Sequence, residues 1–252
     1  ILPKDISAVQ VGIYARAYRL FDAGNNISYL FSVILLPLFA SVIKNGEDLQ
    51  SLVKQSFSLM LTMTCIIAVA CIFYSENLME LLYNIQENES VEAYNHRIHE
   101  SSKILQILMG SFVSISVTYI FGTLLTANGN LRQLNIVAAT GVIINLTLNF
   151  IFIPIFKAQG AAFTSLCVQF ATCAIQFFIA KRIFGLKLGT SFWISIFAFI
   201  TLLILSAFVL KSTSLNWFYS FLITMVCGLI IAFITRMLDY KELKNLIFSF
   251  YL

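Results

Sequence analysis

This sequence has few charged residues. Lys, Arg, Asp and Glu together make up 11% of its 252 residues, whereas a soluble domain averages roughly 25%. Hydrophobic residues make up 59%, and the mean hydropathy is +0.88. Because a soluble core cannot absorb so much apolar surface, the composition excludes an ordinary soluble globular protein.

Motifs for common chemistry are also missing. The sequence has no Gly-rich phosphate loop, no GxSxG, no HExxH and no carboxylate pair inside an apolar stretch. The five cysteines lie in apolar segments without CxxC spacing, which is typical of small buried hydrophobes. His96 and His99 lie in a polar segment, where histidines are usually solvated. We therefore expect neither an enzyme nor a metal or other cofactor, and the scattered charge of +4 does not indicate nucleic acid.

Long apolar runs take the place of these features. Seven runs come near the ~20 residues that a helix needs to cross a ~30 Å hydrocarbon layer. They cover residues 20–43, 55–74, 103–127, 131–154, 160–183, 190–210 and 216–236. Lipid satisfies no backbone N–H or C=O group, so such runs must be helices. The sequence predicts an all-α, polytopic membrane protein, with a tight turn between Pro154 and Gly160.

The distribution of charge gives an orientation. Residues 75–102 form the longest polar interruption and are rich in Glu, which favours the outer side. Alternation from there places most Lys and Arg on the inner side. We therefore expect a cytoplasmic C-terminus.

The start of the first run has the sharpest polar pattern. Arg16, Arg19, Asp22, Asn26 and Tyr29 follow one another at three- or four-residue spacing, so they share one side of a helix. A charge at membrane depth costs about 2.5 kcal/mol or more, so such residues usually face protein, a partner charge or a watery cavity. The alternative is that both arginines reach the headgroups and that Asp22 only neutralises Arg19.

Three further runs have small or polar residues at helical spacing, whereas the last two runs have only scattered ones. The stripes are Ser111, Ser114, Thr118 and Gly122, then Gly141, Asn145 and Asn149, then Ser165, Gln169, Thr172 and Gln176. Helix packing alone could explain them, and we favour it for Asn145 and Asn149, since such contacts contribute roughly 0.6–2 kcal/mol each. If helix packing were the whole explanation, the last two runs should have polar stripes too. We therefore expect a hydrated cavity, with those two runs outside it. The predicted cavity residues are Arg16, Arg19, Asp22, Asn26, Ser114, Thr118, Asn145, Asn149, Gln169 and Thr172.

Two stretches resemble the polysaccharide (Wzx-like, O-antigen) flippases of the multidrug/oligosaccharidyl-lipid/polysaccharide exporter superfamily. The first is VGIYARAYRLFDAGNNISYLFSVILLPLFASVI, residues 11–43. It has Gly12, Tyr14, Ala17, Arg19 and Pro37 at the places of the family's VGxYxxAxR segment and LLP ending. The second covers residues 127–166 and is similar at Gly129, Arg132, Asn145, Asn149, Pro154, Gly160, Ala161 and Ala162. It departs from the family at Lys157-Ala158-Gln159, where a Tyr-Gly pair is common.

The resemblance implies a transporter of two lobes, with this chain as the carboxy-terminal portion and the amino-terminal lobe absent. Residues 1–185 would then form a lobe of five membrane helices, residues 186–238 two peripheral helices, and residues 239–252 a cytoplasmic amphipathic tail.

The resemblance also implies an activity and its partners. Such a protein flips an undecaprenyl-diphosphate-linked oligosaccharide across the bacterial inner membrane, for surface polysaccharide such as O-antigen of lipopolysaccharide. Its partners would be membrane lipid, the lipid-linked glycan, and the polymerase and glycosyltransferases of the same pathway. Arg19 and Arg16 would supply cations to the diphosphate. Coupling to H⁺ or Na⁺ stays open, as do two alternatives: a cation-coupled multidrug exporter using Asp22, and a membrane scaffold subunit.

Overall fold

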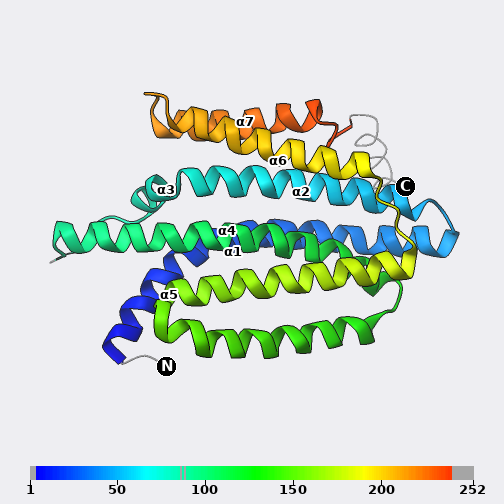
Figure 1. The fold of residues 1–252 in the computed structure, drawn as a ribbon, viewed down its shortest axis with the longest axis horizontal. Coiled ribbons are helices and arrows are strands. Elements are labelled where there is room, and N and C mark those ends of the chain that lie inside the picture. The colour runs from blue at the N-terminus through cyan, green and yellow to red at the C-terminus, as the bar shows by residue number, and fades with distance from the viewer. Residues whose placement is uncertain (1–3, 86, 88, 240–252) are drawn as a thin grey trace.

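The computed structural model of the chain describes residues 4–85, 87 and 89–239. In this part of the chain it shows seven helices and no strand (Figure 1). The helices are α1 (Lys4–Asn45), α2 (Leu49–Phe73), α3 (Ser75–Leu82), α4 (Val91–Ala127), α5 (Leu131–Phe184), α6 (Thr190–Lys211) and α7 (Trp217–Ile234). All except the short α3 are long and apolar enough to cross a membrane. The predicted all-α membrane fold is therefore confirmed.

The longest helix, α5, is a hairpin of two limbs. Lys157 has φ 53° and ψ −129°, which no helix contains, so residues 131–156 and 158–184 are separate helices that reverse direction at this point (Figure 1). Gly160 lies directly after the reversal, and a Cβ there would lie 2.4 Å from the Phe152 carbonyl oxygen. The fourth and fifth predicted spans and the tight turn between them thus correspond to α5.

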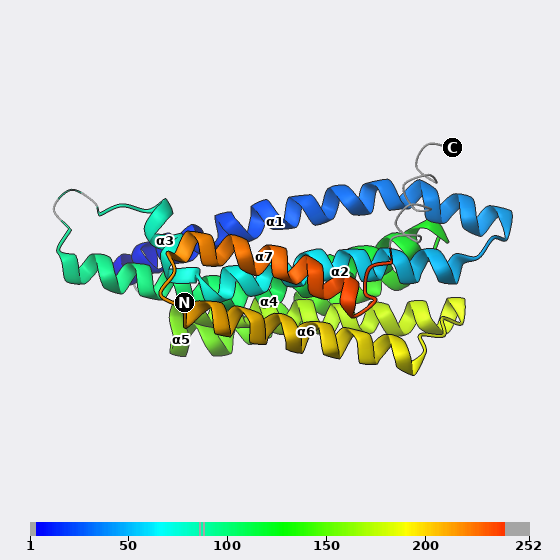
Figure 2. The same ribbon diagram turned by 90° about the horizontal axis from the view of Figure 1, so that it is seen from above.

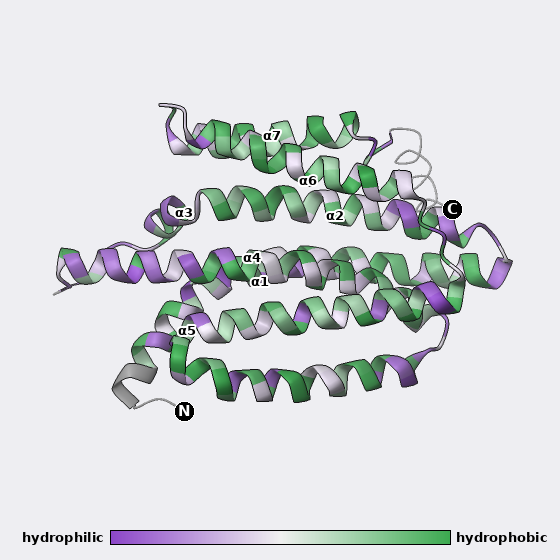
Figure 3. Ribbon diagram, viewed as in Figure 1, coloured by the Kyte–Doolittle hydropathy of each residue, from purple (hydrophilic) through white to green (hydrophobic). Residues whose placement is uncertain are grey.

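Two helices reach well beyond the apolar runs from which they were predicted. α1 begins at Lys4 and not near residue 20, and α4 begins at Val91, inside the polar interruption. Ser90 caps α4 by accepting a hydrogen bond from the Ala93 amide at 3.2 Å, and Glu92 lies in the first turn, where an acid is favourable. Figure 3 shows these hydrophilic turns of α4 extending past the apolar part of the bundle.

The helices pack around α4. α1 and α5 lie against different sides of it (Figures 1 and 2) and meet near the α5 reversal, where the Gln10 Oε1 accepts a hydrogen bond from the Ala158 amide at 3.2 Å. α2 packs on α4 as well, and α6 and α7 pair with each other and cover α2 (Figures 1 and 2). Leu35, Phe39 and Phe121 are fully buried in the largest apolar cluster, together with Phe199 and Leu203 from α6. α6 and α7 thus lie at the edge of the bundle. Residues 240–252, most of the expected tail, lie outside the described residues.

Candidate functional site

One side of α1 is polar and uncovered. Arg19, Asp22, Asn26 and Tyr29, which we call the α1 polar face, all have exposed side chains. The other side of the helix, with Ala17 among others, is packed against the bundle. Four residues of the predicted stripe therefore share an exposed surface of α1, a helix that is long and apolar enough to cross a membrane.

Arg16 does not lie with the α1 polar face. Its side chain is half-buried, and its guanidinium lies over the Tyr83 ring at 5.7 Å from the centroid. The Tyr83 hydroxyl also donates a hydrogen bond to the Arg16 carbonyl oxygen at 3.2 Å. Three residues advance a helix by about 300°, so Arg16 and Arg19 point roughly 60° apart. Of the two, only Arg16 contacts Tyr83 in the segment after α3.

Arg19 and Asp22 do not form an ion pair. Among the described residues, the salt bridges join Arg97 to Glu89, His99 to Glu76 and Lys103 to Glu100. The expectation that Asp22 neutralises Arg19 therefore has no contact to support it. Both charged groups can therefore bind a ligand or residues outside the described part of the chain.

Tyr119 of α4 extends the α1 polar face inward, and sequence reasoning missed it. Its ring meets the Tyr29 ring edge to face, with centroids 5.9 Å apart. Its hydroxyl lies beside the Asn25 side chain and within electrostatic range of Asp22. The one signal in the sequence was that Tyr119 directly follows the Thr118 of a polar stripe, which says nothing about contact with α1.

Ser114 and Thr118 lie in the contact between α4 and α5. Ser114 is buried and its hydroxyl donates to the Gly110 carbonyl at 3.3 Å. Thr118 donates to the Ser114 carbonyl at 2.9 Å and lies beside Cys173 of α5. Their hydroxyls thus bond within α4, which suits close helix packing.

The remaining predicted residues meet in a second polar region, between the limbs of α5. Asn145, Gln169 and Thr172 line an open groove of about 310 Å³ beside Gly141. Asn149 donates its amide to the Asn145 Oδ1 at 2.9 Å, and its own Oδ1 has no hydrogen-bond partner among the described residues. We call this region the α5 groove. None of the residues that line it belongs to α1.

The two regions offer one unpaired cation, one unpaired carboxylate, several amides and hydroxyls, and aromatic rings. A guanidinium and amides can bind phosphate and sugar hydroxyl oxygens. In the described part of the chain, no three His, Cys, Asp or Glu side chains group as metal ligands do.

Residues 1–92 match the family model described as "Polysaccharide biosynthesis protein". The structure is similar to that of a solved lipid II flippase, MurJ, in an inward closed conformation, with a TM-score of 0.72 at 17% sequence identity. The match covers 93% of this chain and 48% of the flippase, so the chain spans about half of that protein's length. No curated protein matches the chain.

These findings confirm the predicted resemblance to the exporter superfamily. The chain is a multi-pass membrane protein. Its first 92 residues match the polysaccharide biosynthesis family, and its helices have the fold of one half of a lipid II flippase.

Proposed function

We propose that the protein is a flippase that moves an undecaprenyl-diphosphate-linked oligosaccharide across the bacterial inner membrane for surface polysaccharide synthesis. The family match and the fold support this class of cargo. The work is transport without covalent change, so the protein is not an enzyme. Residues 1–185 form the lobe that contacts the cargo, residues 186–238 lie outside its path, and the C-terminus is cytoplasmic.

The observation that carries the proposal is Arg19. It is an exposed arginine on a membrane span, with no ion-pair partner in the described part of the chain. An ionisable side chain on a membrane span usually faces protein, water or an anionic ligand, because facing hydrocarbon costs about 2.5 kcal/mol or more. A diphosphate is such a ligand, and Asn26, Tyr29 and Tyr119 lie where attached sugars could contact them.

The mechanism follows from the two-lobe fold. The α1 polar face is one wall of a central cavity, and a facing lobe of the same protein supplies the other wall. Rocking of the two lobes opens the cavity to each side of the membrane in turn. The glycan crosses in this cavity, while its lipid tail stays in the hydrocarbon layer.

The test is translocation of the lipid-linked oligosaccharide by the full-length protein in vesicles. Arg19→Ala should abolish translocation with normal protein abundance, since it removes a cavity cation and no packing contact, and Arg19→Lys should retain part of it. The matched control is Arg182→Ala, an exposed arginine in the last turn of α5. Normal translocation by Arg19→Ala would remove Arg19 from the mechanism, and loss of the protein itself would show a structural role.

A cation-coupled multidrug exporter is the second candidate, because Asp22 is not paired with Arg19 and could bind H⁺ or Na⁺. In that case the wild type should export cationic dyes, and Asp22→Asn alone should stop the export. For a flippase, Asp22→Asn should reduce oligosaccharide translocation only mildly, and the wild type should export no dye.

A further inference from the structure

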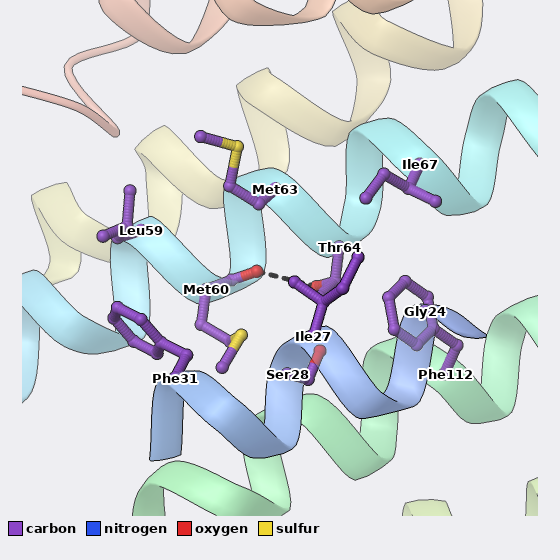
Figure 4. A pocket seen from close by; sticks show the side chains of 10 residues that line it. All are labelled: Gly24, Ile27, Ser28, Phe31, Leu59, Met60, Met63, Thr64, Ile67 and Phe112. Carbon is purple, nitrogen blue, oxygen red and sulfur yellow. Dashed lines mark hydrogen bonds between the residues drawn. The ribbon is translucent and has the colours of Figure 1, made fainter. Parts of the chain in front are cut away.

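An apolar groove separates α1 from α2. It has a volume of about 210 Å³ and is lined by Gly24, Ile27, Ser28 and Phe31 of α1, Leu59, Met60, Met63, Thr64 and Ile67 of α2, and Phe112 of α4 (Figure 4). It exists because α1 packs along α4 and hardly touches α2 over this length.

Among the residues that line it, the groove has no free polar group that could bind water. Its hydroxyl groups are already bonded: Ser28 to the Ser116 hydroxyl at 2.8 Å, and Thr64 to the Met60 carbonyl at 2.8 Å. A buried water needs two to four polar partners, so this space is dry or holds hydrocarbon.

The groove opens sideways from the bundle. Ile27 and Met63 have 65% and 43% of their surface exposed, and both belong to helices that cross the membrane. The molecules that meet such an opening are lipid chains. Met60 and Met63 are unbranched and flexible, so they can adapt to a chain of variable shape.

Arg16 supplies a charge above the groove. It precedes Ile27 by eleven residues, which places it roughly 16 Å further along α1 and within about 20° of the same side. Half of the ~30 Å hydrocarbon layer is about 15 Å, so a chain reaching from the level of Arg16 ends in the groove. No described carboxylate lies within ion-pair distance of the Arg16 guanidinium.

The groove is separate from the α1 polar face. Asp22 lies five residues before Ile27 and therefore points about 140° away from it. A lipid in the groove has its headgroup at Arg16 and not beside Arg19 or Asp22, so it does not share the cargo's path.

From the dry walls, the sideways opening and the position of Arg16, we infer that the groove is a binding site for a resident phospholipid. One acyl chain lies between α1 and α2, and the phosphate contacts Arg16. The inference does not rest on the proposed flippase activity.

The test uses full-length protein in nanodiscs with a phospholipid that has a photoreactive diazirine near the end of one acyl chain. Cross-links should concentrate on Phe31, Met60 and Met63. Ile27→Trp, which fills the mouth, should lower them several-fold, whereas Ile143→Trp on α5, with an equally exposed parent residue (66%), should not. Arg16→Ala should weaken lipid retention about tenfold or more, since it removes a charged hydrogen-bond donor to the phosphate, and Arg16→Lys should restore part of it.

Three results would overturn the inference. Cross-links spread evenly over the exposed helix faces would show ordinary solvation by lipid. An absence of cross-links in the groove would show that another part of the protein fills it. Displacement of the probe by undecaprenyl diphosphate would identify the occupant as the carrier lipid and not a resident phospholipid.

Discussion

Gly160, at the reversal of α5, should not tolerate even one added methyl group. A Cβ at this position would lie 2.4 Å from the Phe152 carbonyl oxygen and 2.7 Å from its carbon. These are backbone atoms, so no side chain can rotate away. Gly160→Ala therefore forces the two limbs of α5 apart near the turn. This movement also shifts the residues of the α5 groove relative to one another.

The magnitude follows from two opposing effects. Overpacking in a close-packed interior costs about 1–3 kcal/mol, whereas replacing a helical Gly by Ala returns about 0.8–1.0 kcal/mol. The net loss for Gly160→Ala is about 0–2 kcal/mol, and we expect the upper part of this range because the atoms in the way belong to the backbone. Gly12 of α1 is the control, because its nearest neighbour would be an Arg16 side-chain nitrogen at 4.0 Å, so Gly12→Ala should stabilise the protein.

The assay is equilibrium unfolding in mixed micelles, followed by tryptophan fluorescence. Gly160→Ala should lower the free energy of unfolding and Gly12→Ala should raise it. If both variants move the free energy in the same direction, the close approach at residue 160 is not a constraint and the account of the α5 turn is wrong.

Two further predictions concern stability elsewhere in the bundle. Arg97 is 8% exposed and donates two hydrogen bonds of 2.7 and 2.6 Å to the Glu89 carboxylate. Arg97→Ala should lower the free energy of unfolding by about 1–3 kcal/mol and speed proteolysis between α3 and α4. The control Arg182→Ala, at an exposed arginine, should do neither. Unchanged cleavage would contradict this role. A Cβ on Gly228 of α7 would lie 2.7 Å from Ile66 Cγ1 of α2. Gly228→Ala should therefore destabilise the protein by about 1–2 kcal/mol. The double variant with Ile66→Ala should lose less stability than the sum of the two single variants. Additive losses would show that the two residues do not meet.

The membrane helices could be predicted because their signal is local. An apolar run of sufficient length has one stable form in lipid, so seven runs gave the spans of α1, α2, α4, the two limbs of α5, α6 and α7. The polar ends of α1 and α4 were missed because hydropathy detects only the apolar part of a helix. It gives no signal where the helix continues beyond the lipid. Only the cap at Ser90 marked the start of α4.

The candidate site was predictable only in part. Spacing placed Arg19, Asp22 and Asn26 on one side of a helix, and that side is open in the structure. It could not show that Arg16 stacks on Tyr83, or that Tyr119 contacts Tyr29, because those contacts join segments that are distant in sequence. The groove between α1 and α2 depends on how two helices diverge, which no single helix encodes.

The central claim is that the α1 polar face lines a hydrated path while the exposed side of α7 contacts lipid. The most direct test is labelling of single cysteines in the full-length protein, with the native cysteines replaced, by a membrane-impermeant thiol reagent. Asn26→Cys should react and should be protected by the lipid-linked oligosaccharide, whereas Ile230→Cys, exposed on α7, should react poorly. Equal reactivity at the two positions, or no protection of residue 26 by the cargo, would contradict the account.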